Sequence, residues 1–200
     1  PGQSDAYRSL KAEAESVLAT LPPEGLRWYE TQFGATARGK LDRAIQNADL
    51  PGMAAVLRCY FYTKAGEEAG LLLTNYHFKR GRPSVAALYA RRVLRKRNLE
   101  TAVRSDAQFL LAASLLMNGQ AEQAERSLKL WRANYPDSTL QLGNQKVDVF
   151  TADDSAAEWL ARVLGIDESR MGLPRFWNGH VAQSVKLPGD LPGGDGAELA

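Results

Sequence analysis

The feature that most restricts the fold is a pattern of small and apolar residues that occurs twice, 38 residues apart. Gly81 and Gly119 each follow an apolar stretch, and Ala86 and Ala124 each follow the glycine five positions later. A small residue in a turn lets two antiparallel helices meet closely, and alanine on the second helix lets its backbone approach a neighbour. The repeat therefore predicts stacked helix pairs that bury their apolar faces against one another.

Helical periodicity extends over most of the chain, because apolar residues recur every three or four positions. The two clear copies begin with apolar helices at 69–78 and 107–117, and a looser copy begins at 41–45, before a turn at 49–52. The second helices of these copies are expected to bury Ala54, Leu57 and Phe61; Ala86, Ala90 and Val93; and Ala124, Leu128 and Trp131. Pro136 then ends the last of them, so the pattern indicates three helix pairs.

Two further helices are predicted before the first clear repeat. One covers about 5–19, ends before Pro22 and Pro23, and has an apolar stripe of Tyr7, Leu10, Ala14, Val17 and Leu18. Pro23 suits the first turn of the next helix, because its missing N–H costs nothing there. The inner side of that helix is expected to carry Trp28, Phe33, Ala37, Leu41, Ala44 and Ile45.

The pattern changes after Pro136. A strand is predicted around 146–150, followed by a short helix over 156–164 that Asp153, Asp154 or Ser155 caps and Gly165 ends. This helix is expected to cap the array. Glycine and proline are dense from Met171 onward, which is typical of a linker. We therefore divide the chain into a helical domain at 1–165 and an irregular tail at 166–200.

Composition excludes several classes of protein. Hydrophobic residues make up 44% of the chain, which is typical of a folded protein rather than a disordered one. The net charge of +2 is too small to indicate a polyanionic partner. The longest apolar runs, such as 69–73, are far shorter than the roughly 20 residues that span a bilayer. The single cysteine, Cys59, cannot form a disulfide within the chain, so cysteine content does not indicate whether the protein resides in an oxidising or a reducing compartment. Pro1 stands where a start methionine is expected, which indicates a processed product or a fragment.

Two resemblances follow from these residues. The series Gly119, Ala124, Leu128, Trp131 and Pro136 resembles the tetratricopeptide (TPR) pattern, although the offset of 38 residues exceeds the usual repeat of about 34. The segments 21–44, 58–69 and 81–94 are similar to the helical N-terminal region of large bacterial, planctomycete-type envelope proteins that carry PQQ-type β-propeller repeats.

The resemblance to TPR repeats implies an all-α, TPR-like right-handed superhelix with an N-terminal and a C-terminal capping helix. The resemblance to the propeller-bearing envelope proteins implies a non-enzymatic protein-interaction or spacer module in the cell envelope or periplasm, joined to a propeller that this chain does not contain. The partner would be a protein or peptide, or the downstream propeller itself.

A candidate groove lies on the inner face that the first helix of each pair presents in such arrays. The repeat register places Asn75, Phe78 and Lys79 there from one pair, and Phe109 and Met117 from the next. Asn75 and Lys79 would hold a peptide backbone or carboxylate, while the other three would contact side chains. The alternative is that this face buries the capping helix and tail of the chain itself.

The densest run of basic residues comprises Arg91, Arg92, Arg95, Lys96 and Arg97. On a helix, Val93 and Leu94 would face the core and the cations would spread over the outside, so a solvated face explains the run. An acidic partner, which includes the acidic C-terminal region of this chain, is a second interpretation. Nucleic acid or anionic lipid is a third, although interleaved aromatic residues are missing.

No combination of residues predicts catalysis, a metal site or a cofactor. The segment from Gly34 to Lys40 has the spacing of a phosphate-binding P-loop, but Leu41 stands where Ser or Thr is required, and the pattern around it is helical. His77, His180 and Cys59 form no recognisable zinc or nucleophile motif. The sequence therefore favours a binding protein over an enzyme.

Overall fold

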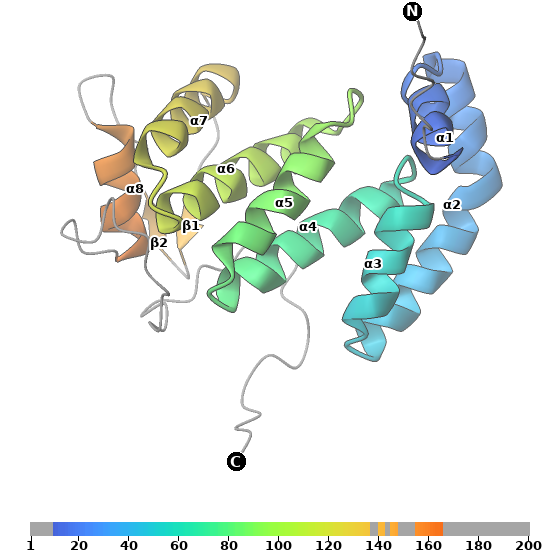
Figure 1. Ribbon diagram of the computed structural model, residues 1–200, viewed down its shortest axis with the longest axis horizontal. Coiled ribbons are helices and arrows are strands. Elements are labelled where there is room, and N and C mark those ends of the chain that lie inside the picture. The colour runs from blue at the N-terminus through green and yellow to red at the C-terminus, as the bar shows by residue number, and fades with distance from the viewer. Residues whose placement is uncertain (1–9, 137–139, 143–144, 148–154, 166–200) are drawn as a thin grey trace, which may run out of the picture.

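The structure, a computed structural model, describes residues 10–136, 140–142, 145–147 and 155–165. These residues form eight α-helices and one small β-hairpin (Figure 1), so the predicted helical fold is confirmed. The helices are α1 (Leu10–Ala19), α2 (Pro23–Gln46), α3 (Leu50–Cys59), α4 (Lys64–Lys79), α5 (Pro83–Leu94), α6 (Thr101–Met117), α7 (Ala121–Asn134) and α8 (Ala156–Leu164). The strands are β1 (Leu140–Leu142) and β2 (Gln145–Val147).

The helix boundaries follow local chemistry. Thr63 caps α4 by accepting a hydrogen bond from the Gly66 N–H at 3.0 Å, and Ser155 caps α8 in the same way. Gly81 and Gly119, the repeated turn residues, have φ of 65° and 74°, a backbone conformation that glycine adopts without strain. The turn predicted at 49–52 is shorter than expected, because Asp49 caps α3 and the helix begins at Leu50.

The helices pack in chain order. Each helix from α2 to α7 lies against the next one, and α2, α4 and α6 also contact one another in succession (Figure 1). The helices therefore pack serially, and the grouping into the pairs α2/α3, α4/α5 and α6/α7 stays a prediction, because α3 and α5 each contact the following helix as well as the preceding one. Helix α8 packs on α7 and α6, so it covers the C-terminal end of the row.

Two buried clusters hold this arrangement together. The N-terminal cluster joins α2, α3 and α4 around Leu41, Met53 and Leu73, whereas the C-terminal cluster joins α4 to α8 around Trp131 and Leu160. The repeat residues Ala86, Ala90, Val93, Ala124, Leu128 and Trp131 are all at most 1% exposed. Helices α4 and α5 approach so closely at Gly70 that an added Cβ would lie 2.4 Å from Val93 Cγ2.

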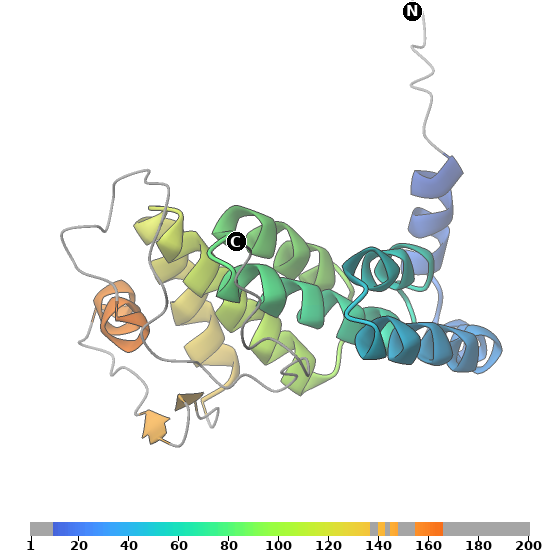
Figure 2. The ribbon, with the colours of Figure 1, turned by 90° about the horizontal axis from the view of Figure 1, so that it is seen from below.

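The N-terminal end contradicts the predicted burial. Val17 and Trp28 are 58% and 62% exposed, Ala14 is exposed, and Phe33 is 39% exposed. Helix α1 stands away from the row of helices (Figure 2), so it does not cap the array. Helix α3 has 10 residues and α2 has 24, which leaves the first half of α2 without an antiparallel partner.

The strand predicted at 146–150 is only partly described. Residues 145–147 pair with 140–142 in an antiparallel register that sets Leu140 opposite Val147. The strand partner at 140–142 was not predicted. Residues 148–150 and the predicted tail at 166–200 lie outside the described part of the chain.

Candidate binding surfaces

A buried ion pair fixes the loop after α5. The ammonium group of Lys96 contacts the Glu67 carboxylate, and both side chains are 7% exposed. Lys96 Nζ also donates to the Tyr62 carbonyl oxygen at 3.0 Å. Burial raises the pKa of Glu67, and the hydrogen bond from Lys96 opposes that change. The prediction that Lys96 belongs to an outer basic surface is therefore wrong, because the residue turns inward to satisfy a buried carboxylate.

The rest of the basic run divides between surface and interior. Arg104 Nη2 donates to the carbonyl oxygens of Lys96 and Arg97 at 2.8 and 2.7 Å, which holds the loop backbone in place. Arg92 is half-buried, with its guanidinium carbon 5.2 Å from the centre of the Phe61 ring. The exposed members of the run are Arg91, Arg95 and Arg97.

A hollow of about 260 Å³ lies beside this loop. Its walls come from the corner between α1 and α2 and from the loop that carries Arg95 and Arg97. Its lining is apolar on the first wall and cationic on the second, and it comprises Leu18, Ala19, Thr20, Leu21, Pro23, Leu26, Tyr62, Arg95, Lys96, Arg97 and Asn98.

The predicted groove residues are mostly in the interior. Asn75, Phe78 and Phe109 are 5%, 3% and 4% exposed, whereas Lys79 is exposed and Met117 is half-buried. Phe78 and Phe109 belong to the C-terminal cluster because α4 and α6 pack directly on each other. Whether these residues bind a partner stays a prediction, and only Lys79 and Met117 are accessible to one.

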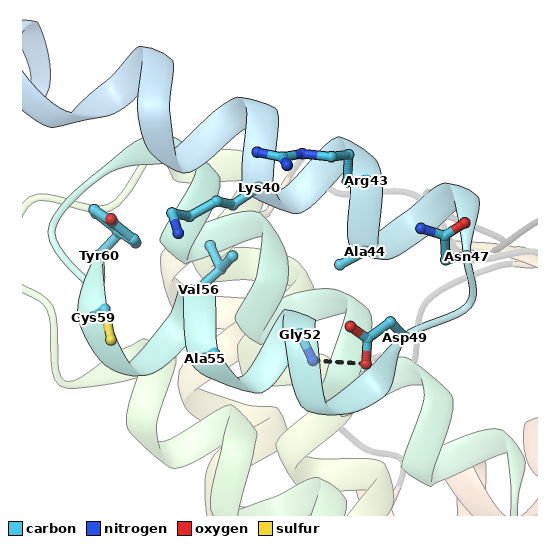
Figure 3. A pocket seen from close by; sticks show the side chains of 10 residues that line it. All are labelled: Lys40, Arg43, Ala44, Asn47, Asp49, Gly52, Ala55, Val56, Cys59 and Tyr60. Atoms are coloured by element: carbon cyan, nitrogen blue, oxygen red, sulfur yellow. Dashed lines mark hydrogen bonds between the residues drawn. The ribbon is translucent and has the colours of Figure 1, made fainter.

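A second hollow, of about 320 Å³, lies between α2 and α3 (Figure 3). None of the sequence patterns described above predicted this hollow. It is lined by Lys40, Arg43, Ala44, Asn47, Asp49, Gly52, Ala55, Val56, Cys59 and Tyr60. Two cations three residues apart on one helix, with Asn47 four residues further on and small residues on the next helix, are the signal that would have indicated it.

The two walls of this α2/α3 hollow differ in chemistry. Lys40 extends from α2 toward the α3 side, whereas Arg43 lies along α2 and donates through Nε to the Gly39 carbonyl oxygen at 3.1 Å (Figure 3). Asp49 accepts the Gly52 N–H at 2.9 Å as the cap of α3. Among the described residues, neither Lys40 nor Arg43 forms an ion pair.

Three candidates for catalysis or ligand binding remain: a histidine, the single cysteine and the P-loop-like segment. His77 is half-buried and stacks on the Tyr89 ring at 5.5 Å, and burial, with help from Arg82, lowers its pKa. Cys59 is an exposed free thiol at the α2/α3 hollow. The P-loop-like segment at 34–40 continues α2 as regular helix, as the periodicity predicted.

No family model matches this chain, and searches of curated proteins and of solved structures return no significant match. Within the described ranges, no helix combines the length and apolar character needed to cross a bilayer. The same residues contain no group of three or more His, Cys, Asp or Glu side chains placed to hold a metal ion.

Proposed function

We propose that this chain is a TPR-like helical-repeat module that binds a protein partner and catalyses no reaction. The serial packing carries the proposal, because α2/α3, α4/α5 and α6/α7 follow one another and their first helices contact in succession. Repeats stacked in this way offer a broad surface on which a few anchors supply most of the affinity. A right-handed superhelix, a cell-envelope location and a propeller neighbour belong to the same proposal.

The α5–α6 loop supports an acidic partner. Arg95 and Arg97 are exposed next to the hollow that Leu21 and Leu26 line, and Arg91 is exposed one turn before Arg95. The contacts of Lys96 and Arg104 hold the loop backbone, so the two loop arginines are presented from a fixed support. A segment that carries carboxylates beside an apolar side chain complements this surface.

Fluorescence anisotropy with a short labelled peptide of alternating Glu and Leu tests this function. We expect Arg95→Glu/Arg97→Glu to weaken binding about tenfold, equivalent to about 1.4 kcal/mol. The matched control is Arg58→Glu/Arg126→Glu, which makes the same change in net charge at two other exposed arginines. Equal losses in both double variants would show that only net charge matters and would contradict the proposal.

A second candidate function is binding of nucleic acid through Arg91, Arg95 and Arg97, which are exposed close together at the end of α5. Labelled duplex DNA in the same assay distinguishes it. The logarithm of the affinity would fall with the logarithm of salt by about 0.9 for each phosphate neutralised. DNA binding tighter than peptide binding, and lost in Arg95→Glu/Arg97→Glu, would favour this second function.

The envelope location has its own test, which is the native reading frame on both sides of these 200 residues. A secretion signal upstream and Trp- and Gly-bearing blade repeats downstream would support the propeller-linked module. A start codon immediately before Pro1 and a stop codon after Ala200 would contradict it.

A further inference from the structure

We propose that the α2/α3 hollow binds a small amphiphilic carboxylate, whose anionic group lies between Lys40 and Arg43 and whose apolar part rests on α3. This site is distinct from the basic loop after α5 and does not depend on the proposed function. Four observations support it: the shape of the hollow, its charge, its apolar floor and its size.

The shape results from residue spacing on two helices. On α2, Lys40, Arg43 and Asn47 are three and four residues apart, so their side chains share one face. The facing wall of α3 repeats the same spacing with side chains too small to fill the space: Gly52, Ala55 and Cys59. The hollow therefore exists because long polar side chains on one helix stand opposite short ones on the other (Figure 3).

The charge of the hollow selects an anion. Lys40 and Arg43 are exposed cations without an ion pair among the described residues. The only carboxylate in the lining, Asp49, already accepts a backbone N–H at the start of α3. A carboxylate between the two cations would relieve their mutual repulsion. The Nε of Arg43 already donates to the Gly39 carbonyl oxygen, so its terminal Nη groups are the donors offered to the carboxylate.

The floor of the hollow selects an apolar body. Val56 is 2% exposed and Ala44 is 4% exposed, and both line the hollow together with Ala55. A volume of about 320 Å³ is at the lower end of the range for ligand pockets, which is roughly 300–1,000 Å³. The fitting ligand is therefore small, and we expect a dissociation constant of about 0.1–1 mM.

Cys59 provides a site-specific readout. It is the only cysteine of the chain, it is exposed, and it lines the hollow. A bound ligand should therefore shield the thiol from a neutral disulfide reagent such as dithiodipyridine. At a phenylbutyrate concentration of about four times its Kd, mass action predicts that the thiol reacts about fivefold more slowly. Phenylbutyramide, the neutral isostere, should give little protection.

Three variants test the assignment, each compared with and without phenylbutyrate so that intrinsic thiol reactivity cancels. Lys40→Glu/Arg43→Glu should lose the protection. Ala55→Leu should lose it too, because it keeps both cations but fills the hollow. Arg58→Glu, on α3 but outside the lining, should retain the full fivefold protection.

Three results would overturn the proposal: no protection by phenylbutyrate, equal protection by the amide, or protection that persists in Lys40→Glu/Arg43→Glu. Circular dichroism checks that each variant is helical, and the charge variant decides the question if Ala55→Leu does not fold. The Arg95→Glu/Arg97→Glu variant should keep the protection, so failure of the peptide-binding function and failure of this site are distinguishable.

Discussion

The two ends of the helical row use similar residues with opposite results. Near the C-terminal end, Trp131 on α7 is 1% exposed, and its indole N–H donates to Ser105 Oγ at 2.9 Å. At the N-terminal end, Trp28 on α2 is 62% exposed. Both tryptophans lie on helices with apolar stripes. The comparison shows that a stripe determines which side of a helix can be buried, whereas a neighbouring helix determines whether it is.

Matching helix lengths account for the difference. Helices α6 and α7 have 17 and 14 residues, so each covers the other along almost its whole length. Helix α8 then covers their open side with Trp159 and Leu160. Helix α3 covers only the second half of α2, and in the first half Trp28 stays largely exposed and Phe33 partly exposed.

The largest expected effect comes from truncating the two tryptophans. Trp131→Ala should lower the free energy of unfolding by about 4 kcal/mol, because it leaves a cavity beside Phe109 and removes one hydrogen bond to Ser105. Trp28→Ala should change it by less than about 0.5 kcal/mol, as surface substitutions do. Urea denaturation of both variants measures the difference, and comparable losses would mean that Trp28 is covered in solution.

The next effect concerns the ion pair that joins α4 to the loop after α5. Lys96→Met should cost about 3 kcal/mol, because it leaves the Glu67 carboxylate buried without its cation. Glu67→Leu/Lys96→Met should recover most of that loss. Lys64→Met, which breaks the exposed pair with Glu100, is the matched control and should be nearly neutral.

The same variant has a pH signature. Burial raises the pKa of Glu67, so the native state binds a proton more readily than the unfolded chain, and acidification through that pKa adds stability. Removal of Lys96 should raise the pKa further. The loss in free energy of unfolding caused by Lys96→Met should therefore become smaller as the pH falls from neutral, as urea denaturation at several pH values would measure. A loss that does not change with pH would argue against a buried carboxylate without its cation.

A smaller effect is expected where carboxylates cap helices from a distance. Glu125 on α7 accepts the backbone N–H groups of Ala156 and Ala157 at the start of α8, and Glu30 on α2 accepts the Lys64 N–H at the start of α4. Glu125→Ala should cost about 1–2 kcal/mol and speed amide hydrogen exchange in α8. Glu30→Ala, which removes one exposed hydrogen bond, should cost less. The reverse order would contradict the greater burial of the α8 contact.

The smallest effect is the pH response of His77. Burial, followed by the charge of Arg82, lowers its pKa, so near pH 6 the unfolded chain binds more protons than the native state. Stability should therefore fall as the pH drops below about 6.5, the ordinary histidine pKa. The His77→Gln variant should lack the decrease in stability that is due to this histidine. Subtracting its pH dependence of stability from that of the unmodified protein isolates the histidine contribution, because Glu67 and Asp106, with raised pKa values, act in the opposite direction in both proteins.

Much of the fold was predictable because its signals are local. Gly81 and Gly119 mark turns, Thr63 and Ser155 cap helices, and Pro23 begins α2, since each of these roles depends on the backbone within four residues. The functional candidates were less predictable. Phe78 and Phe109 share the helix face that was expected to be open, and the direct packing of α4 on α6 buries them.

The sequence by itself determined the helices, the repeated turns at Gly81 and Gly119, and the buried repeat residues on α5 and α7, because periodicity and turn chemistry act over a few residues. The tertiary structure decided which charges remain free. Lys96 turns inward because Glu67, 29 residues away in the chain, needs a partner, while Lys40 and Arg43 form no ion pair with any residue that the structure describes and lie beside a wall of small residues on α3. Such outcomes depend on contacts between distant segments, which no short stretch of sequence encodes.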